Sequence, residues 1–217
     1  MKATLADQIE YASSVLMQIQ TEYASKGFTL CQAALGGSRE FIAWKHYPEQ
    51  DYVDSVSGYE FYYHAHDGFE MPEGEHGHFH LFKRSDRHPK KFMHLIGVAL
   101  DSKGLPVRLF TTNQWVTGET MAQGKHVIRE LTGFTIRARG RLAPIAKWLK
   151  ALLIIYADEI ASLIARRDQW ISRNIDLGTH KSILLQDRNH HVLSECPINL
   201  IEKLSFISIN NRKGTSS

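Results

Sequence analysis

The sequence contains little cysteine and no long apolar run. Its two cysteines, Cys31 and Cys196, are far apart and in no CxxC spacing, which excludes a disulfide framework and a cysteine-based zinc module. This cysteine usage fits a reducing compartment, so we expect a cytoplasmic protein. The longest unbroken apolar run covers residues 151–157, far short of the roughly 20 residues that span a bilayer, so we expect no membrane partner.

Net charge is also small. The chain has 26 basic and 23 acidic residues and a formal net charge of +3, which argues against binding nucleic acid through bulk electrostatics. Arginines alternate at residues 137, 139 and 141, but aromatic side chains are not interleaved with them, so we expect no nucleic-acid partner. Asp7 and Glu10 stand where an export signal would need a basic end and an apolar run, so we expect no export signal.

Length and composition predict one folded domain. The 217 residues, 43% hydrophobic and 23% charged, are enough to bury a sizeable core but too few for two large domains. We place this domain at residues 1–210 and expect a disordered tail at residues 211–217.

Periodicity predicts an α+β fold. Apolar residues recur at three- and four-residue steps near the N-terminus, with Thr4 and Asp7 as a helix cap. The period then changes to two, with β-rich runs at 41–46, 59–66, 78–83, 94–101 and 106–112. Helical spacing returns at 119–131 and 144–171, and short strands are expected at 182–185, 191–194 and 204–209. The prediction is an antiparallel meander or half-barrel of five to six strands, flanked by N-terminal and long C-terminal helices.

An apolar stripe runs from Trp148 to Ile164 along the long C-terminal helix. It is wide enough to cover one face of the sheet, and it fits equally the seam of a homodimer.

Histidine is concentrated in one segment. Eight of the 12 histidines lie between residues 46 and 94: His46, His64, His66, His76, His78, His80, His88 and His94. Side chains alternate along a strand, so His64 and His66 share one face of their strand, and His78 and His80 share one face of theirs. The opposite faces carry apolar residues and are expected to belong to the core.

A hairpin that pairs residue 66 with 78 and 64 with 80 brings these four histidines into a square. Opposed β-carbons lie about 5 Å apart, a span that imidazoles bridge when they bind one metal ion. A register shifted by two residues keeps the facing but breaks this opposition. The loop between the two strands adds Asp67, Glu70, Glu73, Glu75 and His76.

The ligand chemistry favours a divalent transition metal. Imidazole and carboxylate ligands suit Fe, Mn, Ni, Cu or Zn, whereas a closed structural zinc site usually contains thiolates. The candidate ligands are His64, His66, Glu70, His78, His80 and His94. For catalysis we single out His78, and Arg108 as a holder of a carboxylate or phosphate on a small-molecule substrate.

A spaced motif runs through this segment: Gly58, five residues, His64-Ala65-His66, three residues, Glu70, six residues and Gly77. It resembles the first motif of the cupin superfamily, whose members bind a metal inside a small β-barrel. The resemblance implies that His64, His66 and Glu70 are ligands of Fe, Mn, Ni, Zn or Cu, joined by one further histidine, which here has to be His78, His80 or His94.

A second motif overlaps the first. His76-Gly77-His78-Phe79-His80 resembles the signature of the histidine-triad nucleotide hydrolases and transferases. That resemblance implies that the middle histidine, here His78, attacks a phosphate.

Longer segments resemble an uncharacterised family of bacterial proteins. They are WKHYP at 44–48, YYHAH at 62–66, EHGHFH at 75–80 and LPVRLFTTNQWVTGE at 105–119. This resemblance covers most of the chain and implies no particular activity.

Three classes of function remain. The first is a metal-dependent oxygenase, isomerase or hydrolase that acts on a small molecule. The second is a metal- or ligand-binding module without turnover, in which the histidines and Glu70 close the coordination shell. The third is a nucleotide phosphate hydrolase that uses His78.

Overall fold

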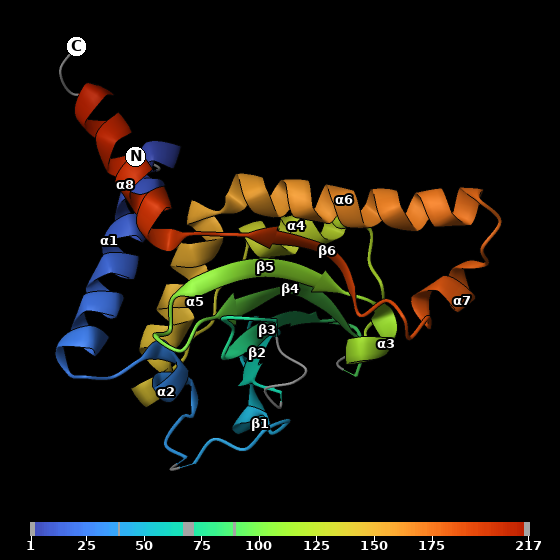
Figure 1. Ribbon diagram of the computed structural model, residues 1–217, viewed down its shortest axis with the longest axis horizontal. Coiled ribbons are helices and arrows are strands. Elements are labelled where there is room, and N and C mark those ends of the chain that lie inside the picture. Colours follow the sequence, from blue (N-terminus) through green and yellow to red (C-terminus); the bar gives the residue numbers. More distant parts are fainter. Residues whose placement is uncertain (1–2, 39, 67–71, 89, 215–217) are drawn as a thin grey trace.

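The computed structural model describes residues 3–38, 40–66, 72–88 and 90–214 of the chain. Six strands form one antiparallel sheet, in which every strand lies beside its neighbours in sequence (Figure 1). The strands are β1 (Tyr47–Val53), β2 (Tyr59–His64), β3 (Gly77–Arg84), β4 (Phe92–Leu100), β5 (Pro106–Thr112) and β6 (Val192–Pro197). Because β1 and β6 are the two edges, the sheet is open, and the predicted α+β meander is confirmed.

Helices precede the sheet, follow β5 and end the chain. They are α1 (Leu5–Ser25), α2 (Leu30–Ala34), α3 (Gln114–Thr117), α4 (Gly124–Thr132), η1 (Gly140–Leu142), α5 (Ala143–Ile155), α6 (Ala157–Asp176), α7 (Lys181–Leu185) and α8 (Leu200–Gly214). The predicted cap of α1 is confirmed, because the Thr4 hydroxyl accepts from the backbone of Asp7 while the Asp7 carboxylate accepts from the backbone of Thr4.

One face of the sheet is apolar and covered by helices. Figure 1 shows α6 lying along the sheet with α4 beside it, and α1 packs against α5. Trp148 and Ile164, the ends of the predicted stripe, both belong to the core formed here. The sheet contributes these side chains to that core: Phe61, Tyr63, Phe79, Leu81, Ile96, Val98, Leu100 and Leu109.

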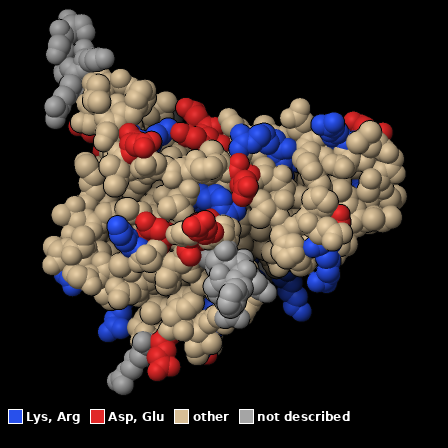
Figure 2. Space-filling view, viewed as in Figure 1, with Lys and Arg blue, Asp and Glu red and all other residues tan. Residues whose placement is uncertain are grey.

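The surface is electrically mixed. Figure 2 shows acidic and basic side chains close to one another over the visible face, in keeping with the net charge of +3. Among the helices of the described ranges, none combines the length and the apolar character needed to cross a membrane.

The strand expected at residues 41–46 is wrong. This segment is a loop, and β1 starts directly after it. Trp44 has a φ of 67°, which is incompatible with an extended chain, and its backbone N–H donates to the carbonyl of Ala65 over 2.8 Å. The segment therefore forms a local turn in spite of its β-rich composition.

Two of the three late strands are also wrong. Residues 182–185 lie in α7 and residues 204–209 lie in α8, whereas the strand expected at 191–194 is present as β6. In α8, Leu200, Leu204 and Ile207 pack against the core at helical spacing, which a six-residue window does not reveal.

The long C-terminal helix is interrupted. Tyr156, with φ −106° and ψ 23°, separates α5 from α6. The helix expected at 119–131 begins only at Gly124. Helix α8 reaches Gly214, into the segment where we expect a disordered tail, and residues 215–217 lie outside the described ranges.

Candidate metal centre

The pairing of β2 with β3 sets the positions of the histidines. His64 lies opposite His78, and Tyr62 lies opposite His80. The predicted pairing of 66 with 78 and 64 with 80 is therefore wrong by two residues. Either register leaves the apolar side chains of both strands on the helix-covered face, so the hydrophobic pattern could not distinguish them. His66 follows the end of β2.

Three histidines nevertheless converge. One ring nitrogen each from His64, His78 and His80 lies within 4.8 Å of the others, and the Nε2 atoms of His64 and His78 are 2.7 Å apart. Two nitrogens that bind one ion at about 2.1 Å lie roughly 3 to 4 Å apart, so small side-chain rotations would close this cluster around an ion. The cluster could therefore hold a metal.

The neighbouring strand leaves room for these rings. On β4, Gly97 lies opposite His80 and Ala99 lies opposite His78. Phe110 of β5 covers Gly97 and contacts both histidine rings edge-on. Its ring centroid lies 5.2 Å from that of His78 and 5.7 Å from that of His80. A β-carbon added at Gly97 would collide with the Phe110 ring.

Burial keeps the cluster neutral. His78 and His80 are 7% and 2% exposed, and burial lowers their pKa values well below the ordinary 6.5, with smaller effects from neighbouring histidines. Burial likewise lowers the pKa of the half-buried His64 to about 3. The His78 Nδ1 atom is buried and has no hydrogen-bond partner within the described part of the chain. Neutral imidazole carries the lone pair that a metal requires.

Two more histidines lie at the outer side of the cluster. The ring of His66 is 5.0 Å from that of His64 and packs at a tilt against Trp44 at 4.0 Å, measured between centroids. The ring of His46 lies 5.4 Å from His64, and its Nδ1 is 2.9 Å from a carboxylate oxygen of Asp51. The position of His46 beside this group was not predicted, because His46 lies on the segment wrongly expected to be a strand.

His94 lies behind the cluster. Its Nε2 is 3.0 Å from Nδ1 of His80, and its Nδ1 is 3.1 Å from the hydroxyl of Thr112. The backbone N–H of His94 donates to the Glu119 carboxylate over 2.7 Å. Burial raises the pKa of Glu119 to about 8, although the His94 N–H and Arg167 oppose this. Thr112 and Glu119 were not among the expected site residues, since no local spacing links them to His80.

Arg108 is engaged by the protein's own carboxylates. Its Nε and Nη2 donate to the two oxygens of Glu75 over 2.5 and 2.9 Å, and its Nη1 donates to Glu195 over 2.9 Å. Arg108 lies opposite Ala99, which in turn lies opposite His78, so two strand spacings separate it from the cluster. Arg108 and its two carboxylate partners line a cavity of about 420 Å³ together with Pro72, Glu73, Gly74 and Val107.

The remaining loop residues are distributed differently. His76 contacts the hydroxyl of Tyr63 through Nδ1 at 2.9 Å, and Tyr63 belongs to the helix-covered face. Asp67 and the candidate ligand Glu70 lie outside the described residues.

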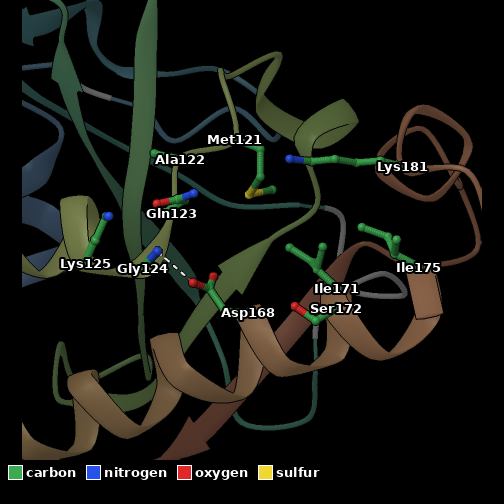
Figure 3. A pocket seen from close by; sticks show the side chains of 10 residues that line it. All are labelled: Met121, Ala122, Gln123, Gly124, Lys125, Asp168, Ile171, Ser172, Ile175 and Lys181. Atoms are coloured by element: carbon green, nitrogen blue, oxygen red, sulfur yellow. Dashed lines mark hydrogen bonds between the residues drawn. The ribbon is translucent and has the colours of Figure 1, made fainter.

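A separate cavity of about 400 Å³ lies between the start of α4, α6 and α7 (Figure 3). Its one carboxylate, Asp168, accepts from the backbone N–H of Gly124 over 2.7 Å and from Arg167 through its other oxygen. Asp168 therefore serves as a cap for α4, which has no cap from the side chain of Gln123.

A family model described as Domain of unknown function (DUF6969) matches residues 10–198. The chain belongs to the DUF6969 family. No curated protein and no solved structure matches the chain. The DUF6969 match includes all six strands and the histidine cluster, whereas α8 follows it. The predicted membership of an uncharacterised family is confirmed.

Proposed function

We propose that the protein binds one divalent transition-metal ion, Fe, Mn, Ni, Cu or Zn, through His64, His78 and His80, and that it is a metal-dependent enzyme for a small molecule. The observation that carries this proposal is the convergence of three neutral imidazoles within 4.8 Å on a buried polar face. Buried imidazoles without a shared cation leave hydrogen-bonding capacity unused, as at Nδ1 of His78.

The exposure pattern supports an enzyme over a closed binding module. His78 and His80 are buried, but His64 and His66 are half-buried and the His46 side chain is 39% exposed. A ligand would reach the ion from this side. When bound, such an ion can polarise a carbonyl or a water molecule, or bind dioxygen. His46, oriented by Asp51, is a group on this side that could move a proton.

The nucleotide-hydrolase alternative receives less support. A nucleophilic histidine must present one ring nitrogen to a phosphate, but Nε2 of His78 contacts His64 and Nδ1 of His78 is buried.

Metal content tests the binding site without a substrate. Elemental analysis of protein purified without an affinity tag or chelator is expected to give about one ion per chain, before or after titration with the five metals. The His64→Ala/His80→Ala double variant should contain none. The matched control is His88→Ala/His126→Ala, which removes two exposed histidines and should retain the ion. Wild-type protein that takes up none of the five metals would overturn the proposal.

An open coordination position can be tested with cobalt and azide. Co²⁺ bound at the cluster has visible absorption bands, and azide should change them if the ion has an exchangeable position on the His64 side. A spectrum that azide does not alter at any concentration would reject the enzyme and leave the binding module.

A further inference from the structure

A row of buried hydrogen bonds continues from the cluster into the sheet. His80 Nδ1 contacts His94 Nε2 at 3.0 Å, and His94 Nδ1 contacts the Thr112 hydroxyl at 3.1 Å. The exposed fractions of His80, His94 and Thr112 are 2%, 2% and 3%. Because the row is shielded from water, each contact needs a defined donor and acceptor.

A β-bulge places His94 in this row. Leu81 pairs with Ile96 and Phe82 pairs with His94, so Leu95 is an extra residue of β4. Regular alternation would turn His94 to the helix-covered face together with Ile96. The bulge instead brings it to the face that carries His80, which is a common use of bulges beside functional sites.

The protons of this row have two arrangements. In the first, His80 Nδ1–H donates to His94 Nε2, and His94 Nδ1–H donates to Thr112. In the second, the Thr112 hydroxyl donates to His94, and His94 Nε2–H donates to Nδ1 of His80. A neutral imidazole has one N–H, so the second arrangement puts the proton of His80 on Nε2. Only the first leaves Nε2 with the lone pair that an ion requires.

We propose that His94 is a positioning residue and not a metal ligand, and that with Thr112 it holds His80 in the tautomer whose Nε2 binds the ion. This inference rests on the metal site proposed above. Both ring nitrogens of His94 are already engaged, so neither is available to the ion. Substitution of such a partner of a ligating histidine typically lowers the metal affinity by about 10- to 100-fold.

Two substitutions at Thr112 form a matched pair. Thr112→Val keeps the shape but removes the oxygen, whereas Thr112→Ser keeps the hydroxyl. In competition with a chromophoric chelator at pH 7.5, Zn²⁺ should bind the valine variant about 10-fold more weakly than wild type, and the serine variant should restore the affinity. His94→Phe should weaken binding by about 10- to 100-fold, with the stoichiometry still one ion per chain.

The tautomer provides a second readout. In zinc-loaded protein, nitrogen-15 spectra of the imidazoles should show a slowly exchanging proton on Nδ1 of His80 and no metal-bound nitrogen on His94. Exchange of the His80 proton should become faster in Thr112→Val. A purely structural role of Thr112 would not change this exchange rate.

The outcomes separate the two proposals. Wild-type protein that binds no metal rejects the site itself. Wild-type protein that binds zinc, with equal affinity in Thr112→Val and His94→Phe, rejects only the positioning role. A metal-bound nitrogen on His94 rejects it as well. If His94→Phe does not fold, the Thr112 pair still decides.

Discussion

The two faces of the sheet both carry buried side chains but differ in chemistry. On β3, Phe79 and Leu81 point to the helices and are fully buried, while His78 and His80 point the other way and are 7% and 2% exposed. Neighbouring residues of one strand thus serve opposite environments, as strand alternation requires.

The difference teaches what each face contributes. Apolar burial stabilises the fold by about 25 cal/mol per Å² with little dependence on partners. Buried imidazoles stabilise it only where their nitrogens are satisfied, and the His78 Nδ1 atom lacks a partner in the described residues. The histidine face is therefore expected to be less stabilising without a ligand, which is typical of functional sites.

Acidification should have the largest effect, because it destabilises the histidine face and leaves the apolar face unchanged. Burial lowers the pKa of His94 to about 3 and those of His78 and His80 well below 6.5, so the unfolded chain binds more protons below pH 6.5. The stability that these neutral histidines contribute is fully present above pH 6.5 and is lost as the pH falls toward their pKa values in the folded protein. Glu119, with a pKa raised to about 8, acts in the opposite direction. At about 1.4 kcal/mol per group and pH unit, His64 and His94, whose pKa values are both lowered to about 3, lose about 5 kcal/mol together from pH 6.5 to 4.5, and Glu119 offsets about 2 kcal/mol of this. His78 and His80 shift in the same direction as His64 and His94, so denaturant titrations of metal-free protein should show a net loss larger than this difference of about 3 kcal/mol.

Glu119→Gln removes the opposing contribution and should make this loss steeper by about 2 kcal/mol. The variant His88→Ala/His126→Ala should follow the wild-type curve. A free energy of unfolding that is constant between pH 6.5 and 4.5 would show that the histidine face is not held neutral by burial.

The second largest effect is expected from removing an aromatic ring on the apolar face, which should change the stability without changing the effect of zinc. Phe79→Ala should lower the free energy of unfolding by about 3 to 5 kcal/mol, because it leaves a cavity against Trp148. Zinc at 100 times its dissociation constant should stabilise both wild type and this variant by about 2.7 kcal/mol. His80→Phe should lose the zinc effect. Chemical denaturation with and without zinc measures the loss of stability in Phe79→Ala and the stabilisation by zinc. Stabilisation by zinc that survives in His80→Phe would contradict the proposal that His80 is a metal ligand.

The smallest expected effect concerns the space beside the cluster. Gly97→Ala would push the ring of Phe110, on the neighbouring strand β5, away from residue 97 and should destabilise the protein by about 1 to 3 kcal/mol. The combination with Phe110→Leu provides more room and should recover part of this loss in thermal unfolding. Equal destabilisation in the single and double variants would mean that Phe110 is not the obstacle.

Much of the fold could be predicted because its signals are local. The strand Pro106–Thr112 and the cap of α1 were predicted correctly from alternation and from a four-residue pattern. The turn at Trp44 and the break at Tyr156 were not, because each depends on contacts or backbone angles that short windows do not encode. Likewise, α8 is helical because its apolar residues meet a core built by distant elements.

The site was predicted in part for the same reason. His64, His78 and His80 follow from strand alternation, which needs no knowledge of the register. The two-residue shift of β2 against β3 was not predictable, since both registers satisfy the apolar face. The position of His94 depends on the bulge at Leu95, and no sequence pattern marks that bulge.

The order of elements along the chain has a consequence for synthesis. β2, β3 and β4 are complete at Leu100, but the helices that cover their apolar face are complete only at Asp176. At roughly 5 to 20 residues per second, the ribosome needs about 4 to 15 s to make the intervening chain. During that interval the nascent meander presents Phe61, Phe79 and Val98 to its surroundings, and apolar surface that is exposed in this way favours aggregation.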